Sequence, residues 1–210
     1  MLAVSGTPVL LVVDIQGGAA SGLPTPGIPV MSGREERAPR VRDLIAHCRA
    51  ASVPVVFVQE VHKRDLIDIG RELDGAEGPH CLEGDPGTEL ASWLEPRPEE
   101  FVIRKRRYSA FFGTELEIVL KAYRAGTLLL VGGLTDVCIH YTAADAHQHD
   151  YAVRVIADCV AGSSERAHAA ALEAIEYLQR DALVSAADVH DWLDRRPVAV
   201  EHAAGASADA

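Results

Sequence analysis

Cysteine is scarce in this sequence, and no two cysteines lie close together. The 210 residues include only four, none of them in a C-x-x-C pair: Cys48, Cys81, Cys138 and Cys159. The first residues lack the basic start of a secretory signal, and the apolar run 9–13 is cut off by an aspartate. In a chain without a leader we expect reduced thiols rather than a disulfide framework, and a cytoplasmic location.

Positive charge and long apolar runs are also scarce. Lys and Arg total 20 against 31 Asp and Glu, which gives a formal net charge of -11. The resulting field repels nucleic-acid phosphates and anionic membranes, so we expect neither as a partner. The one local exception is the basic run 104–107. No apolar stretch approaches the about 18 residues that suggest a membrane-spanning helix.

The motifs of three common enzyme classes are missing as well. The sequence has no G-x-S-x-G, no G-x-G-x-x-G and no G-x-x-x-x-G-K-[ST]. Their absence argues against a serine α/β-hydrolase, a dinucleotide enzyme and a P-loop NTPase. The composition itself is ordinary for a globular protein, with 48% apolar and 24% charged residues.

Short apolar runs alternate with helical patterns along the chain. This alternation predicts a three-layer α/β/α fold around a mainly parallel, doubly wound sheet of about six strands. The expected strands cover 8–15, 54–59, 101–104, 127–131, 151–157 and 182–185, and the expected helices cover 35–51, 114–125, 135–148 and 164–181.

One domain is expected over residues 1–194, followed by a disordered tail over 195–210. Residues 61–98 make a segment too long for an ordinary connection in a compact domain. We therefore expect a lid or substrate-binding excursion that builds the walls of a pocket together with the loop 17–33. Most acids of the excursion are expected to keep an exposed loop solvated.

Three reactive side chains follow expected strands. Asp14 ends the first strand, Lys105 ends the third, and Cys138 opens the helix after the fourth. Taken singly, they fit a turn former, a solvated charge outside the core and a small buried apolar residue. Because function collects at the carboxyl ends of parallel strands, their joint placement favours a reactive site.

The residues around Cys138 favour a nucleophile. Gly132 and Gly133 permit a sharp turn, and Thr135 is a suitable N-cap, so Cys138 would lie near the third position of a helix. The helix dipole and unpaired N–H groups there favour a thiolate and a developing oxyanion. The other thiols lack this context; two are expected to be structural and one stays unassigned, namely Cys48, Cys159 and Cys81.

Three blocks of sequence resemble the signature blocks of the isochorismatase-like cysteine hydrolases. They are LLVVDIQ (10–16), IRKRRYSAFFGTEL (103–116) and VGGLTDVCIHYTAADAHQHDY (131–151), and PGTELASWLEP (86–96) is also similar. The resemblance covers about residues 9–158. The superfamily includes nicotinamidases, N-carbamoylsarcosine amidase, ureidoacrylate and biuret hydrolases, and isochorismatases.

The resemblance implies a set of site residues. It assigns a catalytic triad of Asp14, Lys105 and Cys138. It also implies a cis peptide between Gly133 and Leu134, an oxyanion hole from the N–H groups of Leu134 and Cys138, and a homodimer or homotetramer. The substrate contacts expected on the same basis are Gln16, His62, Tyr108 and Phe111.

Nicotinamidases carry an Asp-x-His followed soon by a second histidine, and these residues bind a metal. Here the matching place reads Glu60-Val61-His62, with one histidine. Zinc sites usually collect three or four ligands. We therefore expect no metal and no cofactor, and a His62 that lines the pocket or faces solvent.

The function expected from these residues is hydrolysis of a C–N bond in a small amide or ureido compound through a thioester. Two alternatives stay open. One is a vinyl-ether hydrolysis of the isochorismatase kind, which does not need a cysteine nucleophile. The other is a non-catalytic binding or scaffold protein on the same fold.

Overall fold

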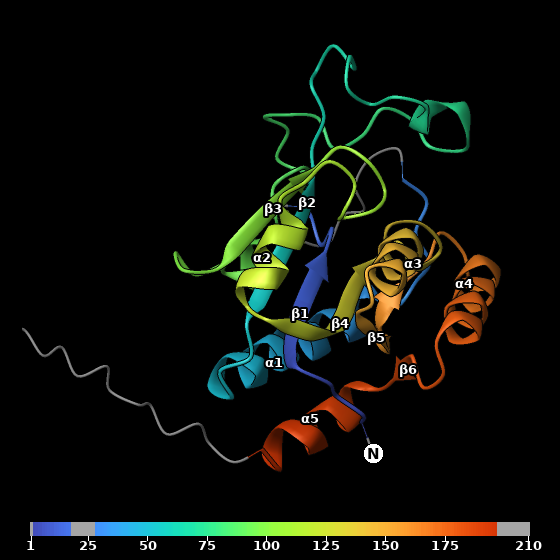
Figure 1. Ribbon diagram of the computed structural model, residues 1–210. Helices are drawn as coiled ribbons and strands as arrows, with labels where there is room; N and C mark the ends of the chain where they lie inside the picture. The colour runs from blue at the N-terminus through green and yellow to red at the C-terminus, as the bar shows by residue number, and fades with distance from the viewer. Residues whose placement is uncertain (1, 18–27, 197–210) are drawn as a thin grey trace, which may run out of the picture.

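Six parallel strands form the centre of the structure (Figure 1), a computed structural model that describes residues 2–17 and 28–196. The strands lie in the order β3-β2-β1-β4-β5-β6, and every pair is parallel. Their bounds are β1 Thr7–Val13, β2 Val55–Glu60, β3 Phe101–Lys105, β4 Ala125–Gly133, β5 Ala152–Ala161 and β6 Leu183–Val184. The predicted α/β class and six-stranded sheet are confirmed.

Five α-helices cover the two faces of this sheet (Figure 1). One face packs against α2, Leu116–Ala122, α3, His140–Gln148, and α4, Glu165–Leu178. The other face packs against α1, Arg34–Ala50, and α5, Ala186–Asp194. None of these helices is long and apolar enough to cross a membrane.

The central strands are apolar on both sides because both sides are covered. In β1, Leu11 and Val13 face the cluster under α2, α3 and α4, whereas Leu10 and Val12 face the cluster under α1 and α5. All four are fully buried. A near-continuous apolar run is typical of a strand in such a doubly covered parallel sheet.

The strand order reverses between β1 and β4, which are neighbours in the centre of the sheet. The chain builds β2 and β3 on one side of β1, then crosses over to build β4, β5 and β6 on the other. In sheets of this kind a ligand crevice forms at the carboxyl ends of the strands, at the point of reversal. Asp14 follows β1 at this point, and Cys138 follows β4.

Two local expectations differ from the structure. Residues 135–148 are not one α-helix, because Thr135–Ile139 form a π-helical turn, η4, before α3 begins. The N-cap of η4 is Leu134 rather than Thr135. The helix α5 was not expected, although a Ser-x-x-Asp capping box at Ser185 and Asp188 marks its start. Of the expected tail 195–210, residues 197–210 lie outside the described residues.

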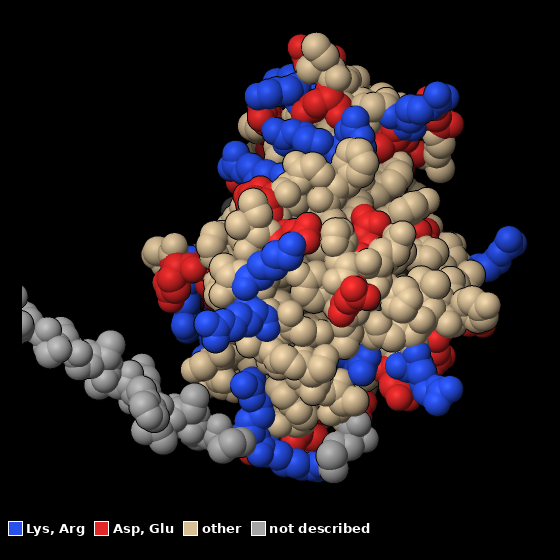
Figure 2. Space-filling view, viewed as in Figure 1, with Lys and Arg blue, Asp and Glu red and all other residues tan. Residues whose placement is uncertain are grey.

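The excursion 61–98 is irregular except for two short 3-10 turns, η2 Glu72–Asp74 and η3 Ser92–Leu94. Acidic and basic side chains intermingle where it projects at the top of Figure 2. Most acids of the excursion were expected only to keep it solvated. Four of them instead form ion pairs with Lys or Arg. The pairs are Asp68 with Arg106, Asp74 with Arg71, Glu83 with Lys63, and Asp85 with Arg64.

A close approach of β1 and β4 gives a test of the fold. Gly132 has a φ of +114, and a Cβ built on it would lie 1.9 Å from the carbonyl oxygen of Val13. We expect Gly132→Ala to lower the free energy of unfolding by at least about 3 kcal/mol, because strain and overlap add. The urea midpoint measures this loss.

Gly113→Ala is the matched control. Gly113 has a positive φ of +68, but nothing lies within 4 Å of its Cβ position. This substitution should cost only about 1 kcal/mol, from backbone strain alone. Equal midpoints for the two variants would contradict the close approach at Gly132.

Candidate functional site

The three reactive side chains meet at the carboxyl ends of β1, β3 and β4. The Lys105 Nζ lies 2.9 Å from Asp14 Oδ2 and 3.4 Å from Cys138 Sγ. Lys105 has no exposure to solvent, and Cys138 is 6% exposed. The structure therefore brings together all three residues that the sequence singled out.

Lys105 differs from its expected place outside the core. It is fully buried because its ammonium has three partners in reach, namely Asp14, Cys138 and Glu60. Glu60 ends β2, makes an ion pair with Lys105 through Oε2, and accepts a hydrogen bond from Cys138 Sγ at 3.7 Å. A buried charge needs such compensation. The sequence reading had not placed Glu60 beside the triad.

Burial dominates the protonation of these groups. It raises the pKa of Asp14 to about 6, against the lowering effect of the Lys105 charge. Burial also raises the pKa of the Cys138 thiol, which Lys105 lowers but Asp14 and Glu60 raise further. Burial opposes the charge on Lys105, yet Asp14, Cys138 and Glu60 outweigh it and hold the lysine pKa well above its ordinary value. The direction of the Cys138 shift opposes the thiolate that the sequence favoured.

The turn that carries Cys138 is held by polar contacts to α4 and the loop before it. The Thr135 Oγ1 lies 2.9 Å from His168 Nδ1. The Asp136 carboxylate accepts hydrogen bonds from the backbone N–H and the hydroxyl of Ser163, at 2.8 and 2.6 Å. The peptide bond between Gly133 and Leu134 is cis.

A pocket of about 450 Å³ opens beside Cys138. Its floor includes Asp14, Glu60, Cys138 and the stretch 132–134. Its walls come from the start of α1 and the residues before it, and from the excursion, which contributes Glu77, His80, Cys81 and Trp93. The described part of the loop 17–33 and the excursion both line the pocket as expected; residues 18–27 lie outside the described residues.

Only two of the four expected substrate contacts line the pocket. Tyr108 lines the pocket. Gln16 also lines it, but its amide is engaged: Nε2 donates to the carbonyl oxygens of Glu60 and Thr88, and Oε1 accepts from the Glu60 N–H. Phe111 does not line the pocket and instead stacks on His149 and Tyr151.

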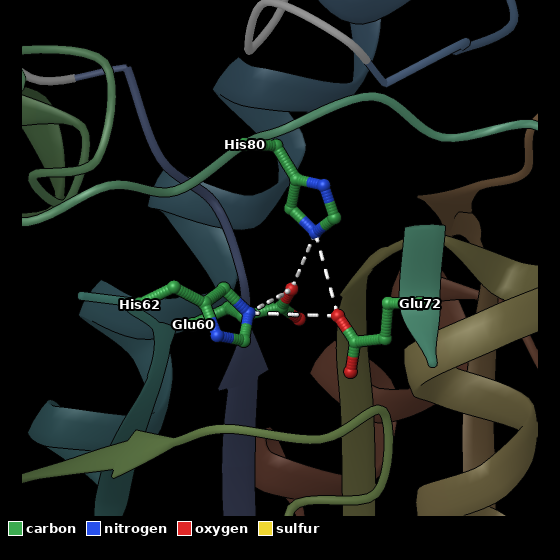
Figure 3. Close-up of side chains that lie close together, drawn as sticks. All are labelled: Glu60, His62, Glu72 and His80. Carbon is green, nitrogen blue, oxygen red and sulfur yellow. Dashed lines mark hydrogen bonds and ion pairs between the residues drawn. The ribbon is translucent and has the colours of Figure 1, made fainter. Parts of the chain in front are cut away.

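His62 was expected to line the pocket or face solvent, and it does neither. It is fully buried in a group of four titratable side chains, shown in Figure 3. Glu60 ends β2, whereas His62, Glu72 and His80 come from the excursion. The Glu60 Oε1 lies 3.3 Å from His62 Nε2 and 2.8 Å from His80 Nε2. Glu72 Oε2 lies 3.5 and 3.6 Å from the same two nitrogens.

Carboxylates surround both histidines. Burial lowers the pKa of each ring, but the facing Glu60 and Glu72 outweigh it and raise the pKa of His62 to about 9 and that of His80 to about 10. Both rings are therefore cationic at neutral pH in the absence of a metal. They balance Glu60 and Glu72, whose pKa values are held below the ordinary range.

The same four residues fit a divalent metal. One ligand atom from each lies within 4.8 Å of all the others. Both oxygens of Glu72 are buried without a hydrogen bond, so the group has unused ligand capacity. Two imidazoles and two carboxylates suit zinc, manganese or iron. The premise that only one histidine stands here is wrong, because His80 joins His62 from a distant part of the chain.

Comparison with known proteins shows the family of the chain. Residues 8–188 match the isochorismatase domain model. Ureidoacrylate amidohydrolase RutB of Methylobacterium radiotolerans is 31% identical over 190 residues, which cover 81% of this chain and 73% of that protein. The solved N-carbamoylsarcosine amidase of Thermoplasma acidophilum is 28% identical with a TM-score of 0.68, over 85% of this chain and 95% of that one.

A third relative shares the fold. Nicotinamidase PncA of Bacillus subtilis has a TM-score of 0.71 at 24% identity, over 85% of this chain and 99% of that one. With a family model that spans most of the chain, and with Asp14, Lys105 and Cys138 assembled at the strand ends, the protein belongs to the isochorismatase family of hydrolases.

Proposed function

We propose that this protein is a cysteine-dependent hydrolase that cleaves a C–N bond of a small amide or ureido compound through a thioester. The observation that carries the proposal is the contact of Lys105 with both Asp14 and Cys138 at the floor of one pocket. The amidohydrolase relatives at about 30% identity support the class of reaction.

In the proposed reaction Asp14 acts as acid and base in turn. With a pKa of about 6 it is mostly a carboxylate at neutral pH and accepts the thiol proton as the sulfur attacks the carbonyl carbon. The carbonyl oxygen becomes an oxyanion, for which the N–H groups of Leu134 and Cys138 are the proposed donors. Asp14 then protonates the departing nitrogen, and the C–N bond breaks to leave a thioester.

The second half of the reaction reverses these roles. A water enters, Asp14 takes its proton, and the resulting hydroxide attacks the thioester carbonyl. The sulfur leaves, recovers a proton from Asp14 and returns to the thiol. Throughout, Lys105 keeps its charge, because its pKa lies well above the ordinary value, and stabilises the negative charge that moves between Asp14 and Cys138.

Glu60, His62, Glu72 and His80 would hold a metal in this site. A bound divalent ion supplies Lewis-acid polarisation of a carbonyl or activation of a water. Glu60 faces both groups, since its Oε1 points to the histidines and its Oε2 to Lys105 and Cys138. We propose that Glu60 positions Lys105 whether or not the metal is bound.

Positive charge on the pocket wall favours a substrate with an anionic group. Arg34 and Arg37, in the first turn of α1, both line the pocket. Glu35 of the same turn also lines the pocket, so this wall carries two positive charges and one negative charge, while Lys105 balances Asp14 and Glu60 on the floor. We propose that a carboxylate of the substrate lies toward the arginines.

Replacing the sulfur separates the proposed reaction from its alternatives. Cys138→Ala should reduce ammonia release from amides or ureas by at least about 10²-fold, since the nucleophile is lost. Vinyl-ether hydrolysis would survive, and a binding role would be unchanged. Cys159→Ala, the control, removes another buried thiol of the pocket wall and should retain activity. Ammonia release in Cys138→Ala at the wild-type rate would exclude the thioester route.

The protonation of Asp14 predicts a pH dependence that needs no substrate. Inactivation by iodoacetamide should slow about tenfold from pH 7 to pH 5, because Asp14, with a pKa of about 6, gains a proton and no longer accepts one from Cys138. Asp14→Asn should replace this titration near pH 6 with a rate that rises steadily with pH, because the thiol then loses its proton only to solvent. Peptide mapping should find Cys138 alkylated first, because Asp14 lies beside it to accept its proton, while burial raises the pKa of Cys48 and Cys159 to about 12. Earlier labelling of either would contradict the assignment.

Metal removal tests the four-residue group. We expect the protein, purified and dialysed against a weak chelator, to retain about one equivalent of a first-row divalent metal, since buried sites release metal slowly. Glu72→Ala and His80→Ala should lose it while circular dichroism shows a folded chain. His149→Gln, which changes an exposed histidine, should keep it. A wild type without metal, before and after reloading, would show that the histidines serve only as counter-ions.

Arg37→Gln tests the anionic substrate. It should raise KM for an N-carbamoyl amino acid by about tenfold and leave KM for a neutral N-alkylurea unchanged, because only the first makes the charged contact. Arg40→Gln is the control, since Arg40 lies on the same helix but outside the pocket and pairs with Glu36. Equal effects on both substrates would contradict the orientation.

A further inference from the structure

A second group of metal-ligating side chains lies between α1 and α5, outside the pocket. Asp43 and His47 are one helical turn apart on α1, and His190 lies on α5. The two helices pack side by side on the same face of the sheet (Figure 1). One ligand atom from each of the three residues lies within 4.8 Å of the other two.

The two imidazoles and the carboxylate face one another closely. The rings of His47 and His190 are stacked, with centroids 4.3 Å apart and planes inclined by 27°. Asp43 reaches both rings, with Oδ1 3.5 Å from His47 Nδ1 and Oδ2 3.5 Å from His190 Nε2. These distances are within the range of ion pairs but too long for strong hydrogen bonds.

One nitrogen of the group has no hydrogen-bond partner. His47 Nδ1 faces Asp43, 2.9 Å from its carbonyl oxygen and 3.5 Å from its carboxylate. His190 Nε2 is buried and has no hydrogen-bond partner. A buried polar atom without a partner is uncommon, and a metal ion would satisfy it.

We propose that Asp43, His47 and His190 bind a divalent cation of the Zn²⁺, Ni²⁺ or Cu²⁺ type, which fastens α5 to α1. Two imidazole nitrogens and one carboxylate oxygen suit these ions, whereas Mg²⁺ and Ca²⁺ require mainly oxygen ligands. Water completes the coordination, because the carboxylate and His47 are partly exposed. The proposal depends neither on the reaction at Cys138 nor on the buried group around Glu60.

The test compares metal-stripped protein with two variants, His47→Gln and His190→Gln. Zn²⁺ or Ni²⁺ should raise the melting temperature of the wild type by about 5 °C at 100 times the dissociation constant. Each variant should lose one binding equivalent in calorimetry, with affinity at this site at least about tenfold weaker. Bound Cu²⁺ should show two nitrogen ligands in its electron paramagnetic resonance spectrum.

His149→Gln is the matched control, because His149 is an exposed histidine 3.6 Å from a single carboxylate, Glu117. It should bind the same number of equivalents as the wild type. The wild type and all three histidine variants keep the buried group around Glu60, so an ion bound there is common to them. The difference in bound equivalents between these proteins therefore reports the site between α1 and α5 alone. Equal stoichiometry and equal melting shifts in the wild type and His190→Gln would overturn the proposal.

Discussion

Lys105 carries a full positive charge at a position with no solvent exposure, and the side chains around it are arranged to balance that charge. Its partners come from strand ends that are far apart in sequence, with Asp14 after β1 and Glu60 at the end of β2. An isolated buried ammonium is strongly unfavourable, and removing one partner of a buried pair costs about 3–5 kcal/mol. The lysine therefore links the stability of the sheet edge to the geometry of the site.

Glu60 extends this balance into the excursion. At neutral pH three cations, Lys105, His62 and His80, face three carboxylates, those of Asp14, Glu60 and Glu72. The charges compensate one another across a single buried network. Because Glu72 and His80 belong to the excursion, the network also holds part of the pocket wall against the sheet. Gln16 adds a neutral tie, since its amide joins the backbone of Glu60 to that of Thr88.

The sequence predicted what depends on local pattern and chain order. Continuous apolar runs identified the strands, and reactive residues directly after them identified Asp14, Lys105 and Cys138. Properties that depend on the path of the excursion were missed. His80 lies 18 positions beyond His62 in a segment without periodicity, so nothing local indicates that the two rings meet. The burial of Lys105 was missed for a related reason, because lysine is rarely buried and its compensating Glu60 was visible only in three dimensions.

Protonation of the resting sulfur constrains the order of events in the proposed reaction. Because Asp14 has a pKa of about 6 and that of Cys138 is raised well above its ordinary value, proton transfer from sulfur to carboxylate is uphill in the empty site. In the proposed reaction the thiolate therefore forms as the sulfur attacks a bound carbonyl. A substrate that fills the pocket displaces water and strengthens the attraction between Lys105 and the developing negative charge. In the proposed reaction selectivity then follows from binding, since a molecule that does not exclude water gains less from the charge of Lys105.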